Sequence, residues 1–162
     1  MDKVKSALKR YSSLREYKVI SDIKLKVRDK EIEFDNILIG CFGVLCLCCF
    51  DEKGELYGSA NDENFVIVDK KMNRTKTENL IKRCTKQTEA LRTLFTDAKI
   101  YNVKLESAIV CSHRKCEAYI SASPYKILSF GDFKKFLAQV KFEMDNKTDV
   151  EKIINEINAH IA

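Results

Sequence analysis

One apolar segment near the middle of the chain limits the possible folds most strongly. Val44–Phe50 reads VLCLCCF, with no charged side chain at any position. Successive side chains of a strand point to opposite faces, so a strand of this composition is buried on both faces. Such a strand belongs in the middle of a sheet that helices cover. The sequence therefore predicts an α/β protein built around this strand.

Hydrophobic periodicity and turn residues predict the elements on either side of this strand. Apolar residues at helical spacing predict a helix over residues 3–15 and a longer one over about 77–96, which follows a polar segment at 70–76. Strands are predicted at 19–27, 32–39, 65–68, 105–112, 117–121 and 126–130. No linker is visible, so residues 1–162 are predicted to form a single domain.

Two further helices are predicted to close the chain. Ser129 with Asp132, and Thr148 with Glu151, have the spacing of a capping box. A clean apolar stripe follows the second pair and predicts an added helix over residues 147–161.

The composition indicates a domain that folds without disulfides or structural metals. A chain of 162 residues can bury about two thirds of the surface that its unfolded form exposes. The seven cysteines are odd in number, three lie within Cys46–Cys49, and no apolar signal segment begins the chain, which together favour a reducing, cytoplasmic location. We interpret these three cysteines as small apolar side chains in a tightly packed strand. No apolar run has the length of a membrane helix, so no membrane contact is expected.

Three runs in a fixed order then indicate a family. They are EFDNILIG (33–40), GVLCLCCF (43–50) and GELYG (54–58). They resemble the nuclease-related domain (NERD), which typically reads "EiDhlvig..GvfviEvK....GkiyG" and belongs to the restriction-endonuclease-like superfamily. The match needs no gaps, places Asp35 at the family aspartate, and extends over about residues 1–140. The resemblance implies a restriction-endonuclease-like fold, a mixed central sheet flanked by helices, with the helix at 147–161 as an addition.

The same resemblance implies a catalytic centre that this chain lacks in part. In such nucleases an aspartate and a Glu-x-Lys motif meet at one end of the sheet, where the carboxylates hold a divalent cation and the lysine helps to position or activate the attacking water. Cys48 stands at the glutamate position and Phe50 at the lysine position. A thiol is a poor ligand for Mg²⁺, and a phenyl ring offers neither charge nor a hydrogen bond. Asp35 is therefore expected to be a vestigial and weak metal ligand.

Two more positions depart from the family pattern. The family's glutamine in the long helix falls at Arg83, and the family's glutamate on the first helix has only Asp2 as a counterpart.

Other carboxylates could complete the site. Asp51-Glu52-Lys53 contains an Asp-x-Lys three residues beyond Cys48, but an odd offset turns Asp51 to the opposite face of a strand, and we favour a solvated turn. Glu33 lies two residues before Asp35 on the same face, where the pair could share a cation. An exposed, solvated pair is the favoured interpretation.

Cys111, His113 and Cys116 suggest a zinc site at a turn between two strands. The three residues lie within six positions and would need a fourth ligand from elsewhere. The close-set pairs of structural zinc sites are absent from the sequence, so we favour a site without zinc.

A set of basic residues precedes and enters the long helix: Lys70, Lys71, Arg74, Lys76, Lys82, Arg83 and Lys86. Such residues could contact the phosphates of a nucleic acid, although a solvated helix face is the slightly favoured interpretation. The net charge of +5 permits a phosphate-rich partner without requiring one. No stacking or base-reading motif is recognisable, so any binding is expected to be weakly selective for sequence.

Two functional hypotheses follow from these residues. The first is a catalytically degenerate nuclease-related domain that acts as a binding or regulatory module for DNA or for a protein partner, with no cofactor. The second is an active DNA endonuclease that uses Mg²⁺ or Mn²⁺ bound to Asp35 with Glu33 or with the segment from Asp51 to Lys53. We favour the first, because phosphoryl transfer without the lysine and the second carboxylate loses its main electrostatic stabilisation.

Overall fold

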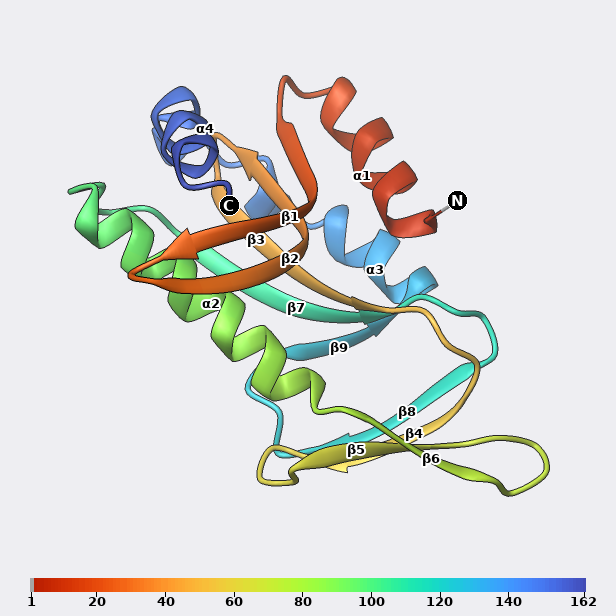
Figure 1. Ribbon diagram of the computed structural model, residues 1–162. Coiled ribbons are helices and arrows are strands. Elements are labelled where there is room, and N and C mark those ends of the chain that lie inside the picture. The colour runs from red at the N-terminus through yellow and green to blue at the C-terminus, as the bar shows by residue number, and fades with distance from the viewer. Residues whose placement is uncertain (1) are drawn as a thin grey trace.

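The computed structural model describes residues 2–162 and contains two mixed β-sheets and four α-helices (Figure 1). The first sheet has the strand order β1-β2-β3-β7-β9. Its strands are β1 (Lys18–Val27), β2 (Lys30–Gly40), β3 (Gly43–Phe50), β7 (Leu105–Cys111) and β9 (Lys126–Ser129). β3 pairs antiparallel with β2 and parallel with β7, so the apolar strand is central, as predicted.

The second sheet has the order β6-β5-β4-β8 and lies below the first in Figure 1. Its strands are β4 (Gly54–Ser59), β5 (Asn64–Val68), β6 (Arg74–Glu78) and β8 (Cys116–Ser121). The fold class is confirmed: the protein is α/β, and its two mixed sheets flanked by helices are consistent with a restriction-endonuclease-like fold.

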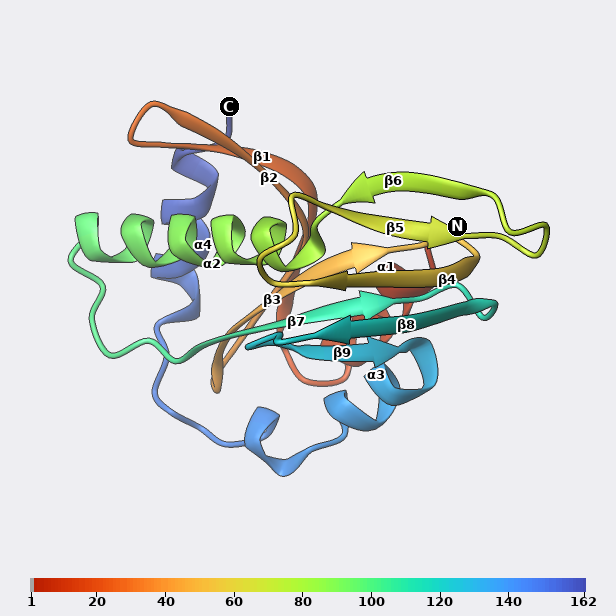
Figure 2. The same cartoon turned by 90° about the horizontal axis from the view of Figure 1, so that it is seen from below.

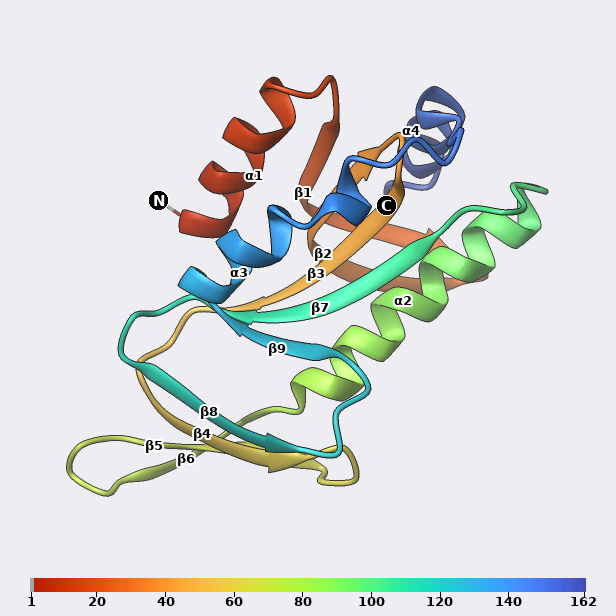
Figure 3. The same ribbon diagram turned by 180° about the vertical axis from the view of Figure 1, so that it is seen from behind.

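Helices cover both faces of the first sheet (Figure 3). The four α-helices are α1 (Lys3–Ser13), α2 (Leu80–Asp97), α3 (Phe130–Leu137) and α4 (Val150–Ala159), and a short 3₁₀ turn lies at Val140–Phe142. α1 and α3 pack on one face, and α2 and α4 pack on the other. None of the helices within residues 2–162 combines the length and the apolar character needed to cross a membrane.

A third apolar cluster fills the space between the two sheets. It joins Cys48 and Phe50 of β3 to Leu56 and Phe65 of the second sheet and to the first turns of α2. The second sheet is therefore folded over the end of β3, and this packing decides what surrounds the degenerate motif.

The start of α2 and the cap of α4 differ from the prediction. Residues 74–78 form β6, which pairs with β5, and α2 begins only at Leu80, where the side chain of Asn79 accepts hydrogen bonds from Ile81 and Lys82 amides. The sequence did not predict β6 because its residues are mostly polar. This composition is possible because β6 lies at the edge of its sheet with one face in water. The predicted cap at Ser129 is confirmed, whereas Asp149, not Thr148, caps α4.

Candidate functional site

The carboxylate of Asp35 lies on β2 and faces the first turns of α2. Arg83 Nη2 donates a hydrogen bond to Asp35 Oδ1 at 2.5 Å. The Cys49 amide donates to Asp35 Oδ2 at 3.1 Å, and Gln87 Nε2 lies 3.5 Å from the same oxygen. Both oxygens of the carboxylate are therefore bonded to groups of this chain.

Burial and the ion pair shift the pKa of Asp35 in opposite directions. Burial raises the pKa of the Asp35 carboxyl above its usual value, while the charge of Arg83 and the hydrogen bonds from Cys49 and Gln87 reduce the rise. Burial also tends to lower the pKa of Arg83, but the carboxylates of Asp35 and Glu78 outweigh this and raise it. The guanidinium thus supplies, from inside the protein, a positive charge beside the carboxylate.

The two positions of the degenerate motif are buried in apolar surroundings. Cys48 is fully buried and Phe50 is 7% exposed, both within the cluster between the sheets. Burial raises the pKa of the Cys48 thiol well above its usual value, so the group stays uncharged at neutral pH. Its Sγ points to the carbonyl oxygen of Leu80, 3.9 Å away. Both side chains are therefore almost completely removed from solvent.

These residues do not fit the divalent cation that the family resemblance implies. A hard cation requires several oxygen ligands, whereas Asp35 is already paired with Arg83 and the neighbouring position offers a buried thiol. Within residues 2–162, no three side chains of His, Cys, Asp or Glu are grouped so that they could hold one metal ion.

Glu33 does not join Asp35 at this site. Its side chain is 72% exposed and its Oε1 lies 4.0 Å from Lys24 Nζ on the neighbouring strand. Asp35 and Glu33 do line one shallow hollow of about 270 Å³, together with Asp22 and Arg83. The pair is thus an exposed glutamate beside a half-buried, ion-paired aspartate.

A second hollow next to Asp35 is lined by four aspartates. Asp2, Asp22, Asp35 and Asp51 surround a space of about 330 Å³. Asp2 also caps α1, because its Oδ1 accepts hydrogen bonds from the amides of Val4 and Lys5. The aspartates of the degenerate motif and of the first helix therefore do lie near one another, as the resemblance implies, although they are too dispersed to form a metal site.

The Asp-x-Lys of residues 51–53 is divided between two hollows. Asp51 lines the aspartate hollow with Asp35. Lys53 lines a separate one of about 430 Å³, in which Lys70, Lys71 and Lys115 also lie. The turn between them separates the carboxylate from the lysine, so the two side chains do not act at one point.

The predicted basic set is divided as well. Lys70 and Lys71 lie at the turn between β5 and β6, whereas Lys86 lines a hollow between α2 and the β1–β2 hairpin. Arg83 is paired with Asp35 and, at 3.3 Å, with Glu78. Its guanidinium therefore pairs with carboxylates of the protein itself. The sequence had suggested a phosphate as its partner.

The cysteine and histidine cluster is a hydrogen-bonded turn. The Cys111 and Cys116 thiols act on each other, which raises the pKa of the Cys111 thiol and lowers that of Cys116. His113 Nδ1 accepts a hydrogen bond from the Lys115 amide at 3.0 Å. One ring nitrogen thus binds the backbone of the turn, and within residues 2–162 the three side chains are not grouped so that they could hold one metal ion.

Sequence reasoning missed two contributors to these sites. Gln87 is 1% exposed, and its Nε2 donates to the Glu33 carbonyl oxygen at 3.0 Å and also approaches Asp35. Its position as a polar residue inside the apolar stripe of α2 was the feature of the sequence that could have revealed this role. Lys115 belongs to the lysine hollow only through strand pairing, which no local pattern shows.

Comparison with known proteins agrees with the resemblance in the sequence. The family model described as nuclease-related domain (NERD) matches residues 2–112, which extend from α1 to the end of β7. Neither the search of curated proteins nor the search of solved structures gave a significant match.

Proposed function

Because the chain belongs to the nuclease-related domain family, we propose that it is a non-catalytic member that binds nucleic acid through phosphate contacts. The observation that carries the proposal is the ion pair between Arg83 and Asp35, beside buried Cys48 and Phe50. The only carboxylate of the degenerate motif is neutralised from within the chain. The thiol and the phenyl ring cannot replace the lost glutamate and lysine.

Energetics support the loss of catalysis. Phosphoryl transfer depends on positioned positive charge that stabilises the developing negative charge on the phosphate. Here Arg83 forms ion pairs with Asp35 and Glu78, so its charge is not available to a phosphate. Phe50 stands at the position of the family's lysine and cannot activate water. Folding of the second sheet over β3 also removes these positions from solvent.

The three aspartates that share a hollow with Asp35 favour a second candidate, an active endonuclease that uses Mg²⁺ or Mn²⁺. A cleavage assay distinguishes the two. Purified protein with either ion should leave supercoiled plasmid and single-stranded DNA intact. Cleavage that disappears in an Asp35→Ala variant would establish the endonuclease instead.

Restoring the family motif provides a complementary test. Cys48→Glu with Phe50→Lys is the smallest change that returns both charged groups, and it is the variant in which activity is to be sought. Unpaired charges at buried positions cost several kcal/mol, so folding must be checked by circular dichroism first. Cys48→Ser with Phe50→Leu is the matched control, because it alters the same two positions without adding charge.

The lysine hollow and the neighbouring basic strand support the phosphate-binding part of the proposal. Lys53, Lys70, Lys71 and Lys115 gather around one hollow, although they come from three separate parts of the sequence. Binding through such contacts should weaken steeply with salt, because it releases counterions from the nucleic acid. A protein partner remains the other candidate if no nucleic acid binds.

We further propose that the protein is cytoplasmic, because its seven free thiols would persist in a reducing compartment.

A further inference from the structure

The outer face of the second sheet is uncovered and has a regular arrangement of side chains. Along β4 and β8, Glu55 and Tyr57 pair with Glu117 and Tyr119, and these residues alternate with the inward Leu56 and Ala118. No helix among residues 2–162 lies over this face in Figure 1, or in Figure 2, where the sheet is viewed from below. Side chains of the outer face are therefore available to a partner.

Two tyrosines stack in the middle of this face. The ring centroids of Tyr57 and Tyr119 lie 5.1 Å apart, and their planes differ by 16°. The side chains are 42% and 50% exposed. Each hydroxyl donates to the glutamate two residues earlier, Tyr57 to Glu55 at 2.8 Å and Tyr119 to Glu117 at 2.7 Å. Two partly exposed aromatic side chains are thus held in a fixed orientation by glutamates of their own strands.

The stack is open at one end. β8 is the last strand in the order of the second sheet, so no further strand lies beyond the ring of Tyr119. On the other side, Val66 and Lys76 continue the row of paired residues from Tyr57. A further planar ring could therefore continue the stack only on the Tyr119 side.

Positive charge collects at the end of the sheet where β4 and β8 begin. Lys53 comes directly before β4 and Lys115 directly before β8, the two strands that carry Tyr57 and Tyr119, and both lysines line the hollow with Lys70. Lys53 lies four positions before Tyr57, at most about 14 Å away along an extended chain. The lysines therefore lie within reach of one short segment of a chain that also touches the tyrosines.

Three carboxylates near this face accept hydrogen bonds from groups of this chain. Glu55 and Glu117 accept the tyrosine hydroxyls. Asp69 accepts the amides of Lys71 and Asn73 in the β5–β6 turn, and those hydrogen bonds lower its pKa. Arg74 and Lys76 of β6 are exposed and add further positive charge beside the rows. Glu55 and Glu117 keep their negative charge, so the phosphates of a partner are expected at the lysine end of the rows and not over the glutamates.

We infer that this face binds single-stranded nucleic acid, with an unpaired base stacked on Tyr119 and the adjoining phosphates in the lysine hollow. The inference rests on the proposed function and identifies the class of nucleic acid and the surface that takes it. Aromatic side chains bind unpaired bases through stacking, and a neighbouring groove of lysines follows the backbone. Bases inside a duplex are already stacked on both faces, so a duplex offers only its phosphates to this surface.

Fluorescence anisotropy with a labelled deoxythymidine dodecamer tests the inference. Tyr119→Ala should weaken binding of this probe about tenfold, whereas Tyr119→Phe, which keeps the ring, should stay within about twofold of the unmodified protein. A self-complementary duplex of the same length should bind more weakly than the single strand and should not respond to Tyr119→Ala. Lys53→Ala with Lys115→Ala should weaken both probes and reduce the salt slope between about 50 mM and about 200 mM.

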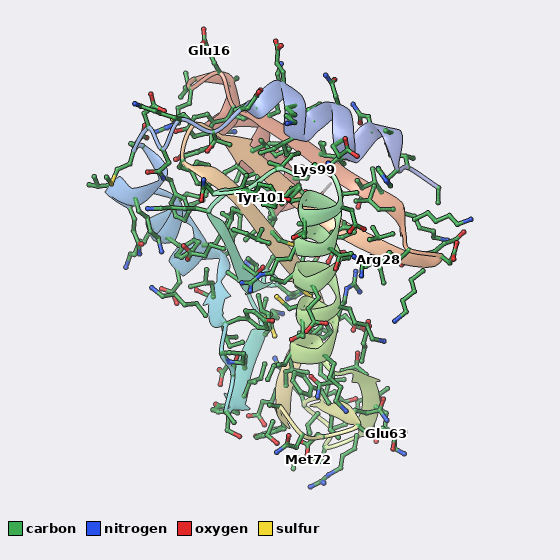
Figure 4. The ribbon with its side chains drawn as sticks, turned by 90° about the vertical axis from the view of Figure 1, so that its left-hand side faces the viewer. Glu16, Arg28, Glu63, Met72, Lys99 and Tyr101 are labelled. Carbon is green, nitrogen blue, oxygen red and sulfur yellow. The ribbon has the colours of Figure 1, made fainter. Side chains whose placement is uncertain are left out.

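Tyr101→Ala is the matched control, because Tyr101 is 66% exposed and lies well away from the β5–β6 turn marked by Met72 in Figure 4. It should leave all affinities unchanged. Equal binding of the single strand by Tyr119→Ala and by the unmodified protein would overturn the inference while leaving the proposed function intact. Failure of both the dodecamer and the duplex to bind would overturn both and leave a protein partner for this face.

Discussion

Removal of Arg83 should destabilise the protein more than removal of its partner Asp35. Both side chains are only partly exposed, 25% for Arg83 and 20% for Asp35, so their ion pair lies between two reference cases. Exposed pairs contribute about 0–1 kcal/mol, and breaking a buried pair costs about 3–5 kcal/mol. We expect Arg83→Ala to lower the free energy of unfolding by about 2 kcal/mol. In a chain of this size that corresponds to a loss of about 4–8 °C in Tm.

The expected asymmetry comes from the remaining partners. Arg83→Ala leaves a half-buried carboxylate with only the Cys49 amide and Gln87. Asp35→Asn leaves Arg83 with Glu78 at 3.3 Å, and an asparagine oxygen can still accept the Cys49 amide, so we expect a cost of about 1 kcal/mol or less. The double variant should be more stable than Arg83→Ala alone, because it carries no unpaired buried charge.

The loss of unfolding free energy in Arg83→Ala should depend on pH. Burial already raises the pKa of Asp35 in the folded state, and loss of the guanidinium raises it further. A carboxyl whose folded pKa exceeds its unfolded pKa opposes folding when it is ionised, and this cost disappears as the pH falls through the folded pKa. The destabilisation should therefore be complete at neutral pH and smaller at mildly acidic pH.

Urea denaturation at the two pH values measures both effects. Lys82→Ala is the matched control, since Lys82 is exposed and adjacent to Arg83 on the same helix. The reasoning is refuted if Arg83→Ala is as stable as Lys82→Ala, or if its deficit grows on acidification.

Two further predictions concern the metal and the packing. Calorimetry should show Mg²⁺ binding no tighter than millimolar, because weak sites follow from few charged ligands; a micromolar isotherm that is lost in Asp35→Ala would contradict the ion-paired site. Gly58→Ala should destabilise the protein by about 1–3 kcal/mol, because the added Cβ would lie 2.1 Å from Cδ1 of fully buried Phe65. Gly131→Ala, where nothing lies within 4 Å of the new Cβ, should be neutral or stabilising by thermal denaturation, and equal losses for the two glycines would argue against the packing of Phe65.

Local patterns in the sequence determined the core of the fold. The apolar strand Gly43–Phe50 is central because a strand without a polar face must be covered on both sides, and this requirement needs no knowledge of its neighbours. The helical stripes of α1, α2 and α4 are likewise visible in the order of residues. The loss of the glutamate and lysine from the nuclease motif is also a property of the sequence, at Cys48 and Phe50.

The tertiary structure alone decided which side chains meet. Arg83 and Asp35 are 48 positions apart, and the sequence suggested a phosphate partner for the arginine. Tyr57 and Tyr119 stack only because β4 pairs in parallel with β8, so no stacking motif was recognisable beforehand. Side-chain periodicity reports burial within one element, whereas the order of strands and their division into two sheets depend on pairings between distant segments. The ion pair and the exposed tyrosine stack both arise from such pairings.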